Sequence, residues 1–524
     1  MEIKKKRILV TCREENCPPF YFLIKEWMKY NEVAVYFIKV SECGLIENPA
    51  NRHTYYAFKK IAGLKLYDVN RIAQTFTDIL NDNEIIDQGL LEEIEKEYTY
   101  FKNLNAQIIS SQSFNRHYHY RNFWPSCTYQ QQLNWLMLCY KDAINVLNEF
   151  QPNVIINTDS DELSRNALRE ICYKKHIPNI TIDFPRFDDY LIYTYNLGDS
   201  VNVKFEEYFE YCKVNNKIDL SIETKYVEDY RQKTEIKNES RANSIDYQYR
   251  PESFLKVIKF WIRFIILLFK KDVIAGNWKI NRSNPMLYSS TLGYIKFFLH
   301  HTYCKQRLMR KNKLFRIPQR GEKYVYMPLH LIPESTTSIL TPFYINELSV
   351  IEAVSKSLPA GWVLYVKEHQ AMLGERSMEF YKAVNRLPNA KMVQLNYYND
   401  PKPWITKSQG VITLSGTAAY EAAMLGKHAA VFSDVPFSLI EGIQRVDSFE
   451  KLPKILSQFV SPLDNIKSCA SYLRTVKVFG EKVDYSNLKE ACHQAIVNNE
   501  ELDENWKNKI KSLECIFAKA IINY

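Results

Sequence analysis

The chain has 524 residues, of which 46% are hydrophobic and 25% charged, so it is long enough for two or three globular domains and is neither fibrous nor disordered. The formal net charge of +9 would suit nucleic-acid binding. Helix-turn-helix, zinc-finger and RNP-type motifs are missing, however, and we expect no nucleic-acid partner. The eleven cysteines include no CxxC pair, which is typical of reduced thiols in a cytosolic protein. The first residues, MEIKKKRILVTC, lack the apolar region of a signal peptide.

Residues 1–220 alternate short apolar runs with helical patterns, which predicts a parallel α/β lobe. Expected strands fall at 7–10, 33–38, 153–157 and 179–183, with a helix at 163–175. Residues 222–250 are polar and contain few large aliphatic side chains, so we expect a linker or a poorly packed segment there.

The stretch 254–269 is apolar but carries Lys256, Lys259 and Arg263, so it is too short and too charged to span a membrane. The three cations are spaced to share one helical face. Two interpretations remain open: a helix packed between domains, or a basic amphipathic helix on an anionic membrane surface. A second basic stretch, 305–320, has seven Lys and Arg residues and no acid, which favours the membrane.

Residues 321–480 repeat the α/β rhythm more clearly. Expected strands are 323–327, 362–366, 391–395, 411–414 and 429–432, with helices at 346–356, 376–386, 403–407 and 418–425. The fold class is therefore α/β with two Rossmann-like lobes, as in GT-B glycosyltransferases. The domains are expected at 1–220, 221–320 (linker and basic helices), 321–480 and 481–524, where the last segment is helical and could pack back across the lobes.

Polar residues follow four strands of the second lobe, at the sheet edge where parallel α/β folds bind ligands. They include His330 and Glu334, then Lys367 and His369, then 399–402, then 415–417. Taken singly, each has an ordinary explanation, such as a loop histidine or an N-cap hydroxyl. Together, the small residues Ser415, Gly416 and Thr417 before a helix predict a phosphate cradle, and Glu421 is placed to bond a ribose hydroxyl.

Three segments, YMPLHLIPESTT, LYVKEHQ and VITLSGTAAYEAAMLGK, resemble in order and spacing the bacterial capsular polysaccharide biosynthesis family that includes the retaining Kdo transferases. The resemblance covers residues 320–435. Gln370 and His428 stand where that family usually has proline. The resemblance implies a GT-B enzyme that transfers a sugar, such as a CMP-activated ulosonic acid, onto a surface glycan or glycolipid.

Carried over to this sequence, the resemblance gives each motif residue a role. Lys367 and His369 would neutralise phosphate or the sugar carboxylate, and Ser415, Gly416 and Thr417 would hold phosphate. Glu421 would hold ribose. His330 and Glu334 would face the cleft between the lobes, where we assign them to catalysis.

The first lobe is expected to supply the catalytic carboxylate. INTDSDELSR, residues 156–165, follows a buried strand and opens a helix, so Asp159 or Asp161 can face the cleft and act in a retaining mechanism. The competing explanation is that these residues cap the helix. Asp183, at the end of the next strand, is a further candidate base.

The sequence therefore predicts a cytoplasmic glycosyltransferase, peripheral to the membrane, with a CMP-linked donor and no further cofactor. We expect no metal, because DSDE at 159–162 is not in the nucleotide lobe and helix dipole and Lys/His charge can stabilise the leaving group. The alternatives are an enzyme resembling the UDP-GlcNAc 2-epimerases, and a non-catalytic glycan- or lipid-binding component of polysaccharide export.

Overall fold

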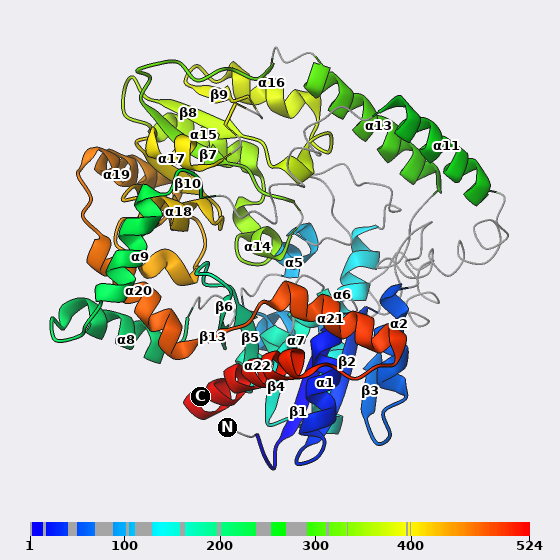
Figure 1. Cartoon of the computed structure of the whole chain (residues 1–524). Coiled ribbons are helices and arrows are strands. Elements are labelled where there is room, and N and C mark those ends of the chain that lie inside the picture. The colour runs from blue at the N-terminus through cyan, green and yellow to red at the C-terminus, as the bar shows by residue number, and fades with distance from the viewer. Residues whose placement is uncertain are drawn as a thin grey trace.

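The computed structural model contains two α/β lobes, each built on its own sheet (Figure 1). The structure describes residues 3–13, 17–39, 50–68, 87–100, 104–110, 128–157, 163–195, 201–236, 253–268, 291–310, 314–332, 334–394, 397–398 and 400–524. The predicted fold class of two Rossmann-like lobes in a GT-B-like arrangement is confirmed.

The first lobe is formed mainly by the N-terminal part of the chain. Its strands are β1 (Arg7–Arg13), β2 (Glu32–Lys39), β3 (Lys65–Asp68), β4 (Val154–Asn157), β5 (Asn179–Asp183) and β6 (Tyr190–Thr194). Its helices include α1 (Pro18–Trp27), α2 (Ala50–Lys59), α4 (Gln88–Glu93), α5 (Leu104–Ser110), α6 (Tyr129–Phe150), α7 (Leu163–Lys174) and α8 (Val203–Val214). Within the described ranges the sheet order is β13-β6-β5-β4-β1-β2-β3, with β1 to β5 parallel and β6 antiparallel to β5.

The second lobe has the strand order of a dinucleotide-binding sheet. Its strands are β7 (Tyr324–Pro328), β8 (Val363–Lys367), β9 (Ala390–Met392), β10 (Gly410–Thr413), β11 (His428–Val431) and β12 (Ile443–Arg445). Its helices are α14 (Ser335–Ser338), α15 (Glu347–Ser357), α16 (Met378–Arg386), α17 (Lys402–Thr406), α18 (Ala418–Met424), α19 (Leu452–Ser457) and α20 (Ile466–Phe479). In the described sheet, β7 lies between β8 and β10, so the strand order reverses at the β7–β10 pair.

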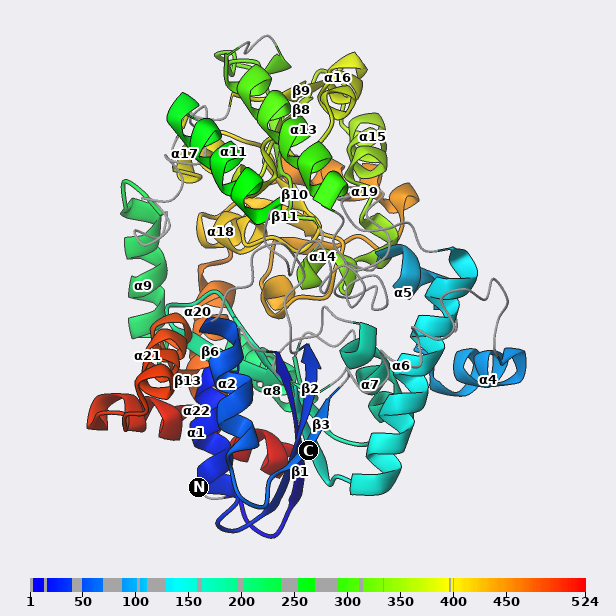
Figure 2. The ribbon, with the colours of Figure 1, turned by 90° about the vertical axis from the view of Figure 1, so that its right-hand side faces the viewer.

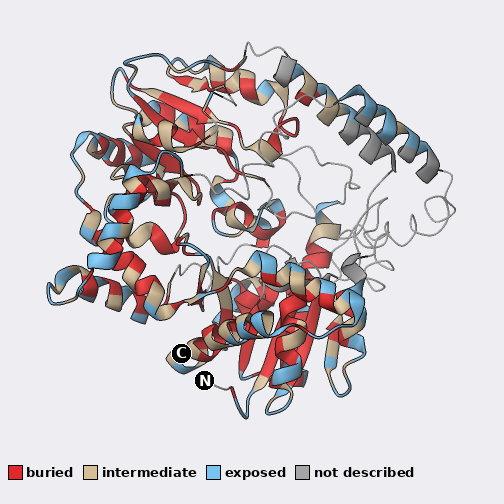
Figure 3. Cartoon of the chain, viewed as in Figure 1, coloured by how far each residue is buried: buried red, intermediate tan, exposed pale blue. Residues whose placement is uncertain are grey.

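Alternating side chains give each sheet two apolar faces. In β7, Val325 and Met327 enter one buried cluster, while Tyr324 and Tyr326 enter the cluster on the opposite face. A sheet buried on both sides explains why the strands appear in the sequence as continuous apolar runs. The buried residues lie along both sheets and the helices that cover them (Figure 3).

The polar segment predicted as a linker begins with a packed helix instead. α9 (Ser221–Gln232) buries Val227 and Tyr230 and packs against α20. Its Glu223 carboxylate is buried and paired with the Lys477 ammonium at 2.6 Å. Tyrosines supply most of the apolar face of α9. The segment therefore contains few large aliphatic side chains, and its composition resembles that of a linker.

The C-terminal segment returns to the first lobe. β13 (Glu481–Lys482) pairs with β6, and α21 (Tyr485–Asn498) and α22 (Glu504–Asn523) pack near α1 (Figure 2). The Phe517 ring lies 5.8 Å from the Phe20 ring, and the Trp27 indole donates to the Glu514 carboxylate. The predicted helical tail is confirmed, and it completes the core of the first lobe.

Two helices lie side by side at the outer edge of the molecule, α11 (Phe254–Leu268) and α13 (Thr291–Arg310) (Figures 1 and 2). None of the helices in the described part of the chain combines the length and the apolar character needed to cross a membrane.

Candidate functional site

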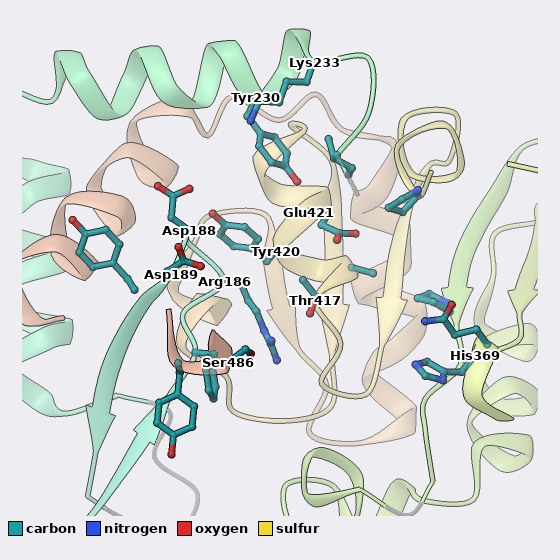
Figure 4. A pocket seen from close by; sticks show the side chains of 18 of the residues that line it. Arg186, Asp188, Asp189, Tyr230, Lys233, His369, Thr417, Tyr420, Glu421 and Ser486 are labelled. Atoms are coloured by element: carbon teal, nitrogen blue, oxygen red, sulfur yellow. The ribbon is translucent and has the colours of Figure 1, made fainter. Parts of the chain in front are cut away.

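A cavity of about 730 Å³ lies between the two lobes, and both contribute side chains to it (Figure 4). The second lobe supplies the ends of β7 and β8 and the start of α18. The first lobe supplies the loop after β5 and the residues after β13, and α9 closes a further side. This cavity, which we call the interlobe cavity, lies at the carboxyl edge of the second sheet next to the β7–β10 pair. Open α/β sheets bind ligands at this position.

Lys367 ends β8 and lines the interlobe cavity. Its ammonium stands 5.8 Å from the centre of the Trp404 ring. Burial lowers the pKa of Lys367 to about 8, although the nearby Glu421 and Asp400 carboxylates act to raise it. The site therefore holds a partly desolvated cation whose charge an anionic ligand would stabilise.

His369 follows Lys367 on the same strand end and also lines the cavity. Its Nδ1 accepts a hydrogen bond from the Ala371 N–H at 3.2 Å, which leaves Nε2 as the ring nitrogen able to carry the proton. Glu368 lies between Lys367 and His369 in the sequence. Its side chain points to the opposite side, because successive side chains alternate along a strand, and it is buried. Lys367 and His369 are thus brought together at the site, as predicted.

Thr417 and Glu421 reach the cavity from α18. Thr417 is the N-cap residue, but its side chain makes no capping hydrogen bond, and Figure 4 shows it directed into the cavity. Glu421 lies one turn further along α18. A hydroxyl and a carboxylate beside a buried ammonium form a polar wall suited to phosphate and sugar hydroxyl groups.

Ser415 and Gly416 lie behind this wall rather than on it. The Ser415 hydroxyl donates to the Thr336 carbonyl at 2.9 Å, and Ser415 is buried. A Cβ on Gly416 would stand 2.5 Å from Thr413 Oγ1 and 3.1 Å from His330 Nε2. The small residue is therefore needed for close packing inside the lobe, which is a different reason from the predicted approach of phosphate.

His330 supports the loop between β10 and α18 from inside the lobe. Its Nδ1 contacts the Glu347 carboxylate at 2.9 Å, and its Nε2 lies 2.9 Å from Thr413 Oγ1, which accepts from the Gly416 N–H at 3.2 Å. His330 is buried and is absent from the described residues that line the cavity. The expectation that it faces the cleft is not met in this conformation, because both ring nitrogens face protein groups.

A buried ion network, which the sequence analysis missed, joins His330 to the Lys367 strand end. Arg376 pairs with Glu347 at 2.5 Å and with Glu368 at 3.0 Å, and it donates to the His330 carbonyl at 2.8 Å. Burial acts to raise the pKa of Glu347, but the Arg376 charge and the His330 contacts outweigh it and keep the pKa below its usual value. The network fixes the ends of β7 and β8 relative to each other.

The first lobe faces this wall with Arg186, Asp188 and Asp189, from the loop between β5 and β6. Arg186 extends between Ser486 and Thr417 in Figure 4, and its Nε is buried without a hydrogen-bond partner among the described residues. Asp188 accepts from the Tyr226 hydroxyl at 3.1 Å. Arg186 and Asp188 both have positive φ angles, 67° and 42°, a backbone conformation uncommon for these residue types.

The remaining predicted residues are not at the cavity or are not described. Asp159 and Asp161 follow β4, the neighbour of β1, but lie outside the described residues. Glu334 is exposed and accepts from the Thr336 hydroxyl at 2.9 Å. Asp183 accepts from the Phe184 N–H at 2.6 Å, and burial raises its pKa. Across the described ranges, no cluster of three or more His, Cys, Asp or Glu side chains is placed to hold a metal ion.

No protein-family model and no curated protein matches the chain in sequence. Among solved structures, it is similar to the β-Kdo 2,7 transferase of KpsC from Thermosulfurimonas dismutans, with 9% identity, a TM-score of 0.33, and 69% of this chain and 90% of that chain covered. It is also similar to UDP-GlcNAc 2-epimerase from Neisseria meningitidis bound to UDP-GlcNAc, with 11% identity, a TM-score of 0.22, and 90% and 99% covered.

Proposed function

We propose that the chain is a retaining glycosyltransferase that needs no metal and transfers a sugar from a nucleotide-linked donor to a bacterial surface glycan or glycolipid. The proposed donor is a CMP-activated ulosonic acid such as Kdo. The observation that carries the proposal is the interlobe cavity, where Lys367, His369, Thr417 and Glu421 of one lobe face Arg186 of the other. The motif resemblance described above supplies the reaction class.

In this proposal the second lobe binds the donor through its phosphate and ribose. Lys367 and His369 place positive charge where the leaving phosphate gains negative charge, and the Thr417 hydroxyl donates to it. Glu421 accepts from a ribose hydroxyl. The Arg376 network positions these groups without touching the donor, because Arg376 is buried behind the strand ends.

The first lobe supplies the carboxylate. Asp159 or Asp161 attacks the anomeric carbon from the face opposite the phosphate, so that the carbon–phosphate oxygen bond breaks as a glycosyl–carboxylate bond forms. An acceptor hydroxyl then displaces the carboxylate and passes its proton to a base in the cleft. Two displacements restore the original anomeric configuration. Asp188 and Asp189, which line the described cavity, are the next carboxylates to consider.

The first experiment is a nucleotide screen by thermal unfolding. A nucleotide present at about 100 times its dissociation constant should stabilise the folded chain by about 2.7 kcal/mol. CMP is expected to raise the melting temperature and to lose this effect in the Lys367→Gln variant. If neither CMP nor UDP changes it, the cavity does not bind a nucleotide and a non-catalytic role is favoured.

The second experiment separates the transferase from the epimerase. A transferase consumes CMP-Kdo and releases CMP only with a glycan acceptor, apart from slow hydrolysis. An epimerase converts UDP-GlcNAc without any acceptor. NMR of the product gives the anomeric configuration, and an inverted linkage would contradict the covalent carboxylate step while leaving the transferase assignment intact.

A further inference from the structure

We infer that α11 is a docking surface for an anionic membrane. The helix presents large apolar side chains to solvent: Phe254 and Leu255 are 78% and 69% exposed, and Ile258, Ile262 and Ile265 are also exposed. Residues 254, 258, 262 and 265 are four, four and three positions apart and therefore share one helical face. An exposed apolar face of this kind is costly in water and marks an interaction surface.

The charges next to this face identify the partner. Positions 256, 259 and 263 carry Lys, Lys and Arg, and at 3.6 residues per turn they lie along the flank of the exposed apolar face. Lys259 is exposed. The helix sequence contains no acidic residue. Apolar side chains bordered by cations suit a lipid surface with negative headgroups, where the apolar face enters the boundary of the acyl region and the cations contact phosphates.

The position of α11 in the molecule agrees with this role. The exposed residues of α11 follow the outer edge of the molecule in Figure 3. Val257 and Trp261, which border the exposed apolar face on the side away from the cations, are partly buried. The neighbouring α13 also exposes Leu299 and Tyr303, four positions apart, and Arg307 one turn further on. If α11 were a helix packed between domains, its five exposed apolar side chains would be covered by protein, and they are not covered by the described residues.

The test is co-sedimentation of the full chain with vesicles of phosphatidylcholine, with and without phosphatidylglycerol. We expect binding that requires phosphatidylglycerol and weakens with salt. Changing Lys256, Lys259 and Arg263 to Gln should lower the partition coefficient about fivefold per residue, or roughly a hundredfold together. The variant Leu255→Gln with Ile262→Gln should lower it more than about tenfold, because it removes apolar area that the lipid would bury.

Matched controls keep the result interpretable. Lys217, Lys454 and Lys511 are exposed lysines elsewhere, and their change to Gln should leave vesicle binding nearly unaltered. Val460 and Ile522 are exposed apolar residues away from α11 and serve as the control for the Leu255/Ile262 pair. Both α11 variants should keep the wild-type melting temperature, because Leu255, Lys259 and Ile262 are exposed and none of the changes removes apolar area from the core.

Three outcomes would overturn the inference. One is a wild-type chain that binds neither kind of vesicle. Another is an equal loss of binding in the control lysine variant, which would assign the effect to net charge. The third is a dimer, seen by sedimentation, that Leu255→Gln with Ile262→Gln disrupts, which would show that a second copy covers the face. Nucleotide binding is measured on the same samples, so failure here is separable from failure of the proposed function.

Discussion

Thr417 and Ser415 are two residues apart, yet the structure gives their hydroxyl groups different tasks. Thr417 faces the interlobe cavity, whereas Ser415 donates to the Thr336 carbonyl inside the lobe. We expect Thr417→Val to weaken nucleotide binding about tenfold to a hundredfold with an unchanged melting temperature, because a hydrogen bond to a charged group is worth about 1.5–3 kcal/mol. Isothermal titration with CMP measures the change.

Ser415→Ala is the matched comparison. It removes an internal hydrogen bond, so we expect a loss of roughly 1 kcal/mol in the free energy of unfolding and little change in nucleotide affinity. The reverse pattern, with affinity lost at Ser415 and kept at Thr417, would show that the loop changes conformation when ligand binds.

Lys367 should make nucleotide binding depend on pH in the alkaline range. In the free chain its pKa is lowered to about 8, and a bound anion would stabilise the ammonium and raise that pKa. Binding above pH 8 must then take up a proton, so the affinity should fall about tenfold for each pH unit above that value and stay constant just below it. Titrations between about pH 7 and pH 9.5 avoid protonation of the nucleotide phosphate.

The Lys367→Gln variant should bind weakly at every pH, without the alkaline slope. Lys427 is a suitable control, because burial also lowers its pKa but its ammonium donates to the Ser408 carbonyl outside the cavity. If Lys427→Gln abolishes the slope and Lys367→Gln retains it, Lys367 is not the group that titrates.

The buried ion network of Arg376, Glu347 and Glu368 holds the ends of the strands β7 and β8 against the helices α15 and α16. Arg376 is the cation between Glu347 and Glu368, and all three side chains are buried. Arg376→Met should therefore cost about 3–5 kcal/mol in the free energy of unfolding, because two carboxylates lose their counter-charge. Urea denaturation of the variant measures this loss.

A compensated variant tests the electrostatic reason. Arg376→Met combined with Glu347→Gln and Glu368→Gln leaves no buried charge unpaired and should recover most of the stability. Nucleotide affinity should recover less, because the His330 loop support is altered. If the triple variant is as unstable as the single one, packing rather than charge explains the cost.

The sequence predicted the elements whose signal is a long apolar run, such as β7, β8 and β10, and the helix after residues 415–417. It missed short strands such as β13, whose two residues carry no periodicity. It also missed Arg186, which lines the cavity, because loop residues come to a site through the fold and not through spacing. His330 was assigned to the cleft from the motif resemblance and its strand-end position, and neither reveals the Glu347 and Thr413 partners.

In the proposed mechanism the second lobe binds the donor and the first lobe supplies the carboxylate nucleophile. We expect one of Asp159→Asn and Asp161→Asn to lose activity by several orders of magnitude while CMP affinity and melting temperature stay unchanged. The other aspartate should act as a cap, with a change of about 1 kcal/mol at most. Activity is measured as CMP release from CMP-Kdo with acceptor present.

Asp189→Asn is the comparison on the described side of the cavity. Full activity in both the Asp159 and Asp161 variants, together with inactivity of Asp189→Asn, would move the catalytic carboxylate to the loop after β5. Full activity in these three variants and in Asp188→Asn would remove the carboxylate mechanism.

The first lobe should not be soluble without the C-terminal segment. Removing residues 481–524 would take away β13, α21 and α22 and expose the Phe20 and Trp27 rings that pack on Phe517. We expect the truncated chain to aggregate, while Phe517→Ala in the full chain should only lower the free energy of unfolding by about 3–5 kcal/mol. Size-exclusion chromatography distinguishes the two results, and a monomeric truncated chain would contradict this prediction.

This return of the chain to its first lobe has a consequence for biosynthesis. Domains generally fold during translation in the order in which they leave the ribosome. Here the second sheet, β7 to β12, is continuous in sequence. The first sheet, in contrast, is complete only after β13 and the C-terminal helices that cover the sheet have been synthesised. The lobe whose strands are synthesised first would therefore be completed last, and its apolar surface around Trp27 would be open to chaperones while the remainder of the chain is made.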